Sequence, residues 1–555
     1  MIPETDYVAA PLRDPAAVMR LSRMGAFHPT RLSFKRTLIR RLNREQATVT
    51  RPVWEIDDEG YGRAVYSVPL GGHTYSLIAY SNRLNPEDRT DRVIAEAWDT
   101  TYVLFDGVPE TADLDRLQSE VPRQEAGRCS AKELVLSRAN KSVRLFAHVV
   151  ERLAEGAQPD REMIRKIGYL MRTTAVYGNG KFGIADRGVF ADRPAVNGPF
   201  RVEMLTVWLI RGFTHDLVEH CATAHNPNAA KLDPAIKRHL GVGNSTGLGM
   251  APFLVNHPIL LNNWMQVRET ALARVKAVKT ATADKIASYR ALVARARACI
   301  DDWNVEDERQ QGRTLVLREE LAALAERPLA TTFPWADLID ATADMSEEAQ
   351  ELIVSMVLEP YGELIDGLED CMGGEAEPRL DPAMKLGELK TLIEDRFDWA
   401  LAIDFDEPEQ QRRFWYTSEE KLEPRIGDRF VEDGADKEEP LHIARDVQAL
   451  ASALNDEDEG ELTARFLMQN PHLRRIVKRV QSAPWAPYAE IQDNLIASTC
   501  LPIDMLRCKL SFFGASKFDP KSDLWTRVNL YQGAPTAADI SADGADDWSF
   551  PVLNA

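Results

Sequence analysis

Residues 66–80 read YSVPLGGHTYSLIAY, and this stretch decides how the N-terminal part of the chain is expected to fold. Two runs rich in Val, Tyr and Thr flank Gly71 and Gly72, and two glycines between such runs suit the two-residue turn of a β-hairpin. The runs RPVWEI (51–56) and TTYVLFDG (100–107) have a similar composition. The sequence therefore predicts an antiparallel sheet near the N-terminus.

Beyond about residue 130 the apolar residues follow a helical period. The segment SAKELVLSRANKSVRLFAHVVERLAEG (130–156) begins with a Ser-x-x-Glu capping box and ends at glycine, which indicates a helix. Near the C-terminus, LSFFGASKF and WTRVNLYQG are typical of strands. We expect a mainly α (α+β) protein: a large helical body, a small antiparallel sheet near the N-terminus and a short β element near the C-terminus. Further helices are expected at 161–175, 200–224, 259–300, 313–326, 346–370, 383–403, 442–455 and 460–482.

The sequence also suggests how the chain is divided. The segment 405–440 is charged and interrupted by prolines, as linkers are, yet it contains the aromatic run RRFWY, which favours packing on a surface or over a site. The last residues form an acidic tail whose Trp548 and Phe550 could dock on the body. The expected parts are an α+β region (1–125), a helical core with the candidate site (126–404), a linker or lid (405–440), a second α+β region (441–533) and the tail (534–555).

Composition restricts the function classes. The net charge of −19 opposes non-specific binding to nucleic acid, and no run approaches the roughly 18 to 20 apolar residues of a membrane span. The N-terminus lacks the apolar core of a secretory signal, and the six cysteines form no CxxC pair, so a cytoplasmic protein with reduced thiols is expected. The oligomeric state stays open, a homo-oligomer included.

Between 172 and 263 the residues suited to chemistry are crowded, and five of the ten histidines fall there. The first element is RTTAVYGNGKFGIADRG (172–188), in which glycines surround Tyr177, Asn179 and Lys181. Such a loop can wrap an anionic ligand with backbone N–H groups and the lysine charge. It lacks the spacing of a P-loop.

The second element is the expected helix 200–224. Arg211, His215 and Glu219 would align on one face at four-residue spacing, and Asp216 and His220 on the adjacent one. A carboxylate beside an imidazole fixes its tautomer and raises its basicity, so each pair could be a base with its orienting group.

The third element is GVGNSTGLGMAPF (241–253), followed by His257. Its spacing is not the G-x-G-x-x-G of dinucleotide-binding folds, and no strand is expected before it. It is better interpreted as a helix N-terminus at which Gly243, Asn244, Ser245 and Thr246 contact a carboxylate or phosphate.

Other chemistries have weaker signals. Asp216, Glu219 and His220 give D-x-x-E-H, which lacks one histidine of the H-x-x-E-H zinc pattern, so no metal ligand is assigned and metal binding is the weaker alternative. Ser245 lacks the G-x-S-x-G nucleophile elbow, and nothing in the sequence activates Cys221. There is no nicotinamide, flavin or pyridoxal phosphate motif, and the cofactor is left open.

We therefore expect an enzyme acting on a small anionic metabolite, such as a carboxylate, an organic phosphate or a coenzyme A ester. The glycine-rich loops, Arg211 and Lys181 would hold the anion. His215 or His220 would move protons, with Tyr177 as a further acid–base group, in a lyase or hydrolase reaction. The alternative is a non-catalytic helical scaffold whose basic helix at 265–298 binds an acidic partner or RNA.

Overall fold

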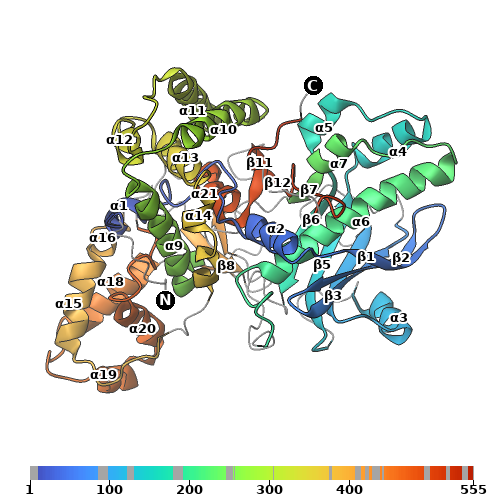
Figure 1. The fold of residues 1–555 in the computed structure, drawn as a ribbon. Coiled ribbons are helices and arrows are strands. Elements are labelled where there is room, and N and C mark those ends of the chain that lie inside the picture. The colour runs from blue at the N-terminus through green and yellow to red at the C-terminus, as the bar shows by residue number, and fades with distance from the viewer. Residues whose placement is uncertain are drawn as a thin grey trace. The chain divides into compact units, whose positions relative to one another are not determined.

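The computed structural model describes residues 10–84, 98–121, 130–178, 192–244, 254–255, 257–303, 305–373, 378–406, 414–418, 424–427, 438–440, 443–492, 501–520, 526–540 and 548–553. The chain divides into two compact units, each built from stretches that are distant in sequence, as the mixed colours of Figure 1 show. The sheet unit comprises 26–247, 278–366 and 509–555, and the helical unit comprises 1–25, 248–277 and 367–508.

A nine-stranded sheet forms the centre of the sheet unit (Figure 1), in the order β1-β2-β3-β4-β5-β6-β7-β12-β11. All neighbouring strands are antiparallel except β6 and β7, which run parallel. The strands are β1 (Thr50–Ile56), β2 (Gly62–Leu70), β3 (His73–Ser81), β4 (Thr100–Asp106), β5 (Glu133–Lys141), β6 (Tyr169–Gly178), β7 (Gly241–Asn244), β11 (Ala515–Pro520) and β12 (Thr526–Leu530).

The predicted hairpin at 66–80 is confirmed. Strands β2 and β3 pair with Leu70 opposite His73, and Gly71 and Gly72 form the turn with φ of 62° and 77°. Two consecutive positive φ values are those of a type I′ turn, which residues other than glycine, asparagine or aspartate rarely adopt.

Helices cover both faces of this sheet. The long helix α6 (Arg201–His225) contacts strands β2 to β7 and also packs on α2 (Phe34–Arg44) and α4 (Phe146–Ala154). Helix α3 (Thr111–Glu120) packs Leu114 and Leu117 into an apolar cluster with side chains of β2 to β5. Two short helices, α5 (Arg161–Ile167) and α7 (Pro234–His239), precede β6 and β7.

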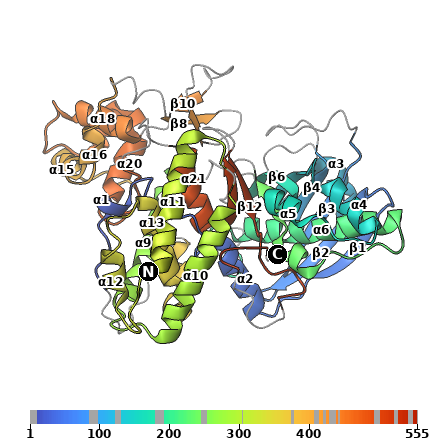
Figure 2. The same cartoon turned by 90° about the horizontal axis from the view of Figure 1, so that it is seen from above.

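The rest of the sheet unit is helical. Figure 2 shows α10 (Ala283–Asp301) and α11 (Glu308–Glu326) side by side, and α13 (Glu347–Leu358) contacts both. Helices α12 (Trp335–Asp340) and α14 (Gly362–Ile365) lie before and after α13 in the chain, and the π-helical turn η7 (Lys509–Phe513) precedes β11. Trp548 and Phe550 near the C-terminus are buried within this unit.

The helical unit contains helices of very different lengths and a second, three-stranded sheet in the order β10-β8-β9. That sheet includes the backbone of the aromatic run, because β8 spans Phe414–Ser418. No helix within the described ranges of either unit is both long and apolar enough to cross a lipid bilayer. The elements of the helical unit are α1 (Pro15–Val18), α9 (Pro258–Lys276), η4 (Leu368–Met372), α15 (Leu386–Arg396), α16 (Asp398–Leu401), β8 (Phe414–Ser418), β9 (Pro424–Gly427), β10 (Glu438–Pro440), α18 (Ile443–Leu454), α19 (Thr463–Gln469), η6 (Pro471–Leu473), α20 (Arg474–Ser482) and α21 (Pro502–Cys508).

The predicted fold class is wrong, because the β part is neither small nor divided between the two ends of the chain. The segment 130–156 is not one helix: β5 occupies Glu133–Lys141, and only Phe146–Ala154 is helical. The segment 161–175 becomes helix α5 followed by strand β6, and 241–244 is strand β7 instead of a helix N-terminus. The strands expected near the C-terminus exist as β11 and β12, but they join the same nine-stranded sheet.

Burial on both faces explains why these strands escaped detection. Nearly every residue of β5 is buried, so its sequence shows no alternation of apolar and polar side chains. Strand β7 has only four residues, two of them glycines, and so carries no strand signal. In such segments a helical period can arise by chance.

Candidate functional site

Helix α6 carries five of the predicted site residues, and their bonding partners show what each one does. Arg211 is 2% exposed, and its guanidinium donates to main-chain carbonyls: Nε to Leu240 (2.7 Å), Nη1 to Pro535 (2.9 Å) and Nη2 to Ala534 (2.9 Å). Burial lowers the pKa of Arg211 to about 9, which still leaves it charged at neutral pH. Arg211 therefore ties α6 to the start of β7 and to the C-terminal segment of the sheet unit.

His215 and Glu219 are one turn apart on α6 but bond in different directions. His215 is 3% exposed, and burial, with Arg211 second and Lys237 third, lowers its pKa well below the usual value. Glu219 accepts from the Leu232 amide and the Lys237 ammonium, each at 3.1 Å. The imidazole is thus neutral and enclosed, and the carboxylate anchors the segment that leads to α7.

Asp216 and His220 belong to a network between α6 and the first two strands. Asp216 accepts from the Tyr66 hydroxyl (2.6 Å) and from Arg51 (2.9 Å), whose guanidinium lies over the Trp54 ring. The Trp54 indole donates to Nδ1 of His220 at 3.4 Å, and Nε2 of His220 lies 2.9 Å from the Asp57 carbonyl oxygen. An imidazole that accepts at Nδ1 and donates at Nε2 is neutral. The network joins Asp216 to His220 through aromatic and guanidinium groups, and the partners described for these two residues do not include each other.

The thiol of Cys221, on the same helix, is also enclosed. It is 7% exposed, and burial raises its pKa. A thiol nucleophile needs a lowered pKa and access to its substrate. The geometry of Cys221 offers neither.

The glycines at the start of GVGNSTGLGMAPF are required by close packing within the sheet. A Cβ added to Gly241 would lie 2.4 Å from the Leu530 carbonyl oxygen on β12, and one added to Gly243 would lie 2.8 Å from the Tyr169 ring on β6. The Leu530 carbonyl is fixed by the pairing of β12 with β7, and the Tyr169 ring is itself buried. Gly243, predicted as a ligand contact, therefore has a steric role in β7.

Asn244, the last residue of β7, is held by a buried lysine. Nζ of Lys509, on the π-helical turn η7, donates to Oδ1 of Asn244 at 2.6 Å, and Nδ2 of Asn244 lies 3.5 Å from the Thr173 carbonyl oxygen on β6. Lys509 is 2% exposed and Asn244 is 4% exposed. A charged donor strengthens such a bond to about 1.5–3 kcal/mol and fixes the amide of Asn244 in one orientation.

The topology makes this end of β7 distinctive. Asn244 pairs with Thr173, and β6 continues for five residues beyond that pair, to Gly178. In open sheets, ligands bind outside the carboxyl ends of parallel strands, and β6 and β7 are the parallel pair. Both glycine-rich loops predicted to hold an anion follow these two carboxyl ends. The π-helical turn that carries Lys509 is a further mark, since such turns are frequent at functional sites.

The remaining predicted residues are distributed as follows. Tyr177 lies in β6, next to its last residue, and its side chain is outside the described part of the chain. Asn179, Lys181, Ser245 and Thr246 also lie outside the described residues. His257 precedes α9 in the helical unit, whereas Gly243 and Asn244 belong to the sheet unit. Within the described ranges, no three His, Cys, Asp or Glu side chains are grouped so that they could hold a metal ion.

The basic segment 265–298, predicted as one helix, is divided. Helix α9 ends at Lys276 in the helical unit, and α10 begins at Ala283 in the sheet unit. Several of its cations are bonded within their own units: Arg268 to Glu269, for example, at 2.8 Å. Binding of an acidic partner or RNA by this segment stays a prediction.

Sequence reasoning missed Lys509. It lies in CLPIDMLRCKLSFFGASKFD, which reads as a core segment, and its partner is 265 residues away in the sequence. The available signal was a lysine flanked by Leu, Cys and Phe, because a cation in an apolar run must find a buried partner. No protein-family model, curated protein or solved structure matches the chain.

Proposed function

We propose that the chain is an enzyme that acts on a small anionic metabolite at the carboxyl ends of β6 and β7. The observation that carries this proposal is the Lys509–Asn244 bond, which holds a buried ammonium beside the start of a glycine-rich loop. In a low-dielectric environment a cation attracts an anion more strongly than it does in water. A carboxylate, an organic phosphate or a coenzyme A ester would supply the anion.

In this proposal Lys509 provides the positive charge and Asn244 provides an oriented amide. Lys509 has three N–H donors, one of which is directed at Asn244, and its Nζ lies 5.8 Å from the centre of the Phe513 ring. Tyr177, at the end of the neighbouring strand, is proposed as the acid–base group of a lyase or hydrolase reaction. In this proposal the five predicted site residues of α6 hold that helix against its neighbours and act on the site only through that support.

Ligand-dependent thermal stability tests the proposal. The full chain is screened against carboxylates, phosphate esters and coenzyme A esters, because a ligand that binds the folded state raises its unfolding temperature. Asn244→Asp is the informative variant: it keeps the shape of the side chain and places a carboxylate beside Lys509, so that the ammonium is neutralised. We expect the wild-type response to any stabilising anion to be lost in Asn244→Asp.

Lys517→Met is the matched control, since Lys517 on β11 is another buried lysine of the sheet unit and donates to the Arg165 carbonyl oxygen on α5. Its response to the anion should equal that of the wild type. If Asn244→Asp responds as the wild type does, or if no anion of the panel stabilises the wild type, the proposed site is wrong.

A further inference from the structure

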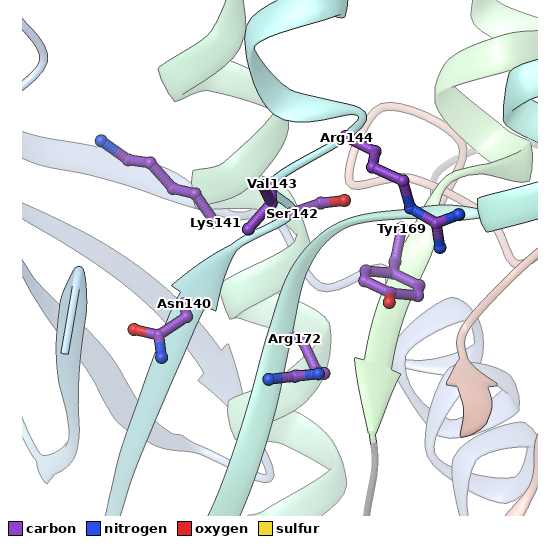
Figure 3. A pocket seen from close by; sticks show the side chains of 7 residues that line it. All are labelled: Asn140, Lys141, Ser142, Val143, Arg144, Tyr169 and Arg172. Carbon is purple, nitrogen blue, oxygen red and sulfur yellow. The ribbon is translucent and has the colours of Figure 1, made fainter. Parts of the chain in front are cut away.

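A small hollow lies where β5 ends and β6 begins (Figure 3). It encloses about 310 Å³, counting space open to solvent. It is lined by Asn140, Lys141, Ser142, Val143, Arg144, Tyr169 and Arg172.

The charges of this lining are of one sign. Three of its side chains are cationic and none is acidic, although the chain as a whole has 86 acidic and 67 basic residues. Arg172 is 5% exposed, and Arg144 is exposed to solvent. Figure 3 shows the Arg144 guanidinium above the Tyr169 ring and Arg172 lower on β6, whereas Lys141 points away from these three side chains.

The neutral side chains offer hydrogen-bond donors. Oδ1 of Asn140 accepts from the Asp99 amide at 3.0 Å, which identifies the other end of the side-chain amide as the NH₂ donor. Oγ of Ser142 accepts from the Leu145 amide at 3.3 Å, which leaves its hydroxyl hydrogen to donate. The nearby carboxylate of Asp99 is 2% exposed, and its Oδ2 accepts from the Lys141 amide.

We propose that this hollow binds a tetrahedral oxyanion: a phosphate group, either free or at the end of a small phosphate monoester. Guanidinium groups match phosphate oxygens with parallel N–H donors, and Arg144 and Arg172 supply two of them from different elements. The site is distinct from that at Asn244. Arg172 and Thr173 are consecutive in β6, so their side chains lie on opposite faces of the sheet, and Thr173 is the partner of Asn244. This inference does not depend on the proposed function.

Arginine-selective modification tests the proposal on the full wild-type chain. Phenylglyoxal reacts with accessible guanidinium groups, and peptide mapping by mass spectrometry gives the rate at each arginine. At constant ionic strength, about 20 mM inorganic phosphate should slow the modification of Arg144 about three-fold, as expected for a dissociation constant near 10 mM. Arg152 on α4 is the matched control, because its side chain is 41% exposed and does not line the hollow. It forms an ion pair with Glu155 on the surface. Its rate should not change.

Two further arms identify the anion and the site. Glycerol phosphate in place of inorganic phosphate distinguishes a monoester from the free ion, and acetate should protect Arg144 less than either. Tyr169→Phe removes the hydroxyl while the ring still packs on Gly243, and it should weaken the protection of Arg144. Equal slowing at Arg144 and Arg152, equal protection by acetate, or no protection by either phosphate compound would overturn the proposal.

Discussion

Lys35 on α2 is a buried lysine whose removal should stabilise the protein. It is 0% exposed, and its Nζ has no hydrogen-bond partner among the described residues. Its surroundings are aromatic: Nζ lies 4.7 Å from the centre of the Trp548 ring and 5.9 Å from that of Tyr531. Gly514, with φ of 96°, packs against its methylene groups.

Two opposing effects decide the charge of Lys35. Contact with aromatic rings favours the ammonium by about 0.5–2 kcal/mol, whereas burial of an unpaired charge costs several kcal/mol. Burial therefore dominates, and together with the positive charges of Arg36 and Arg211 it lowers the pKa of Lys35 well below its usual value. The unfolded chain then binds a proton that the folded protein does not, so this lysine destabilises the fold increasingly as the pH falls below about 10.4.

The magnitude follows from the same relation. Each pH unit over which Lys35 is neutral when folded and charged when unfolded changes the free energy of unfolding by about 1.4 kcal/mol. Over the roughly 3.4 units between pH 7 and the ordinary lysine pKa, the limit is about 4.6 kcal/mol, and at pH 8.7 it is about half of that. Lys35→Met keeps the unbranched apolar stem and removes the titration. We expect it to raise the free energy of unfolding at pH 7 by up to this limit.

Urea unfolding of the wild type and Lys35→Met at pH 7.0 and pH 8.7 measures the effect. Other groups that titrate in this range are common to both proteins, so they cancel in the difference. Lys517→Met, in which the lost ammonium had a carbonyl partner, should be destabilised instead. The reasoning is refuted if Lys35→Met is no more stable than the wild type at pH 7, or if its advantage does not shrink as the pH rises.

Three further predictions concern buried polar groups of the sheet unit. Glu359→Gln should lower the free energy of unfolding by about 3–5 kcal/mol, because Glu359 accepts at 2.7 and 2.9 Å from Arg36, which would be left charged and buried; the double variant Arg36→Met/Glu359→Leu should recover most of this loss in urea unfolding. Arg211→Lys should cost about 2–4 kcal/mol, since one ammonium cannot reach all three carbonyls of the two segments and each buried carbonyl left unpaired costs about 1–3 kcal/mol; an unchanged unfolding midpoint would contradict the anchoring role. Burial, with Lys517 second, lowers the pKa of His239 to about 4, so the folded state binds fewer protons than the unfolded state between that value and about 6.5. The free energy of unfolding should therefore decrease by up to about 3.4 kcal/mol as the pH is lowered from about 6.5 to about 4, and His239→Gln should flatten this pH dependence in urea unfolding.

The elements that could be predicted from the sequence are those with local signals. The hairpin at 66–80 has its turn glycines and alternating strands in one short stretch. Helix 200–224 matches α6 (Arg201–His225) within a residue at each end, since 25 residues of mostly apolar sequence without proline or a turn signal leave few alternatives. The strands β5, β6 and β7 were missed because their stability comes from neighbours distant in the sequence, and most residues of β5 and all of β7 are buried.

In the candidate site, too, the sequence indicated residues with a local signal and missed those whose partners are distant in the sequence. Asn244 is a candidate from the sequence because a polar residue between glycines and an apolar run is locally unusual. Lys509 could not be paired with it, because nothing local relates two residues 265 positions apart. The α6 histidines and carboxylates were correctly placed on one helix, but a helix has neighbours on all sides, and the spacing of residues along it does not say which neighbour each side chain meets. In the structure Asp216 bonds to Tyr66 and Glu219 bonds to Lys237, so residue spacing along the helix did not predict these partners.

Different residues of the run GVGNSTGLGMAPF have different structural explanations. Gly241 and Gly243 are explained fully by steric contact with β12 and with the Tyr169 ring, so they would be needed in a protein that bound nothing. Packing of the strand does not, however, require an amide at position 244 or a buried ammonium to bond it, because an apolar pair of similar size would avoid the cost of burying the charge. The hypothesis of an anion site therefore depends on Asn244 and Lys509 and gains nothing from the two glycines that precede them.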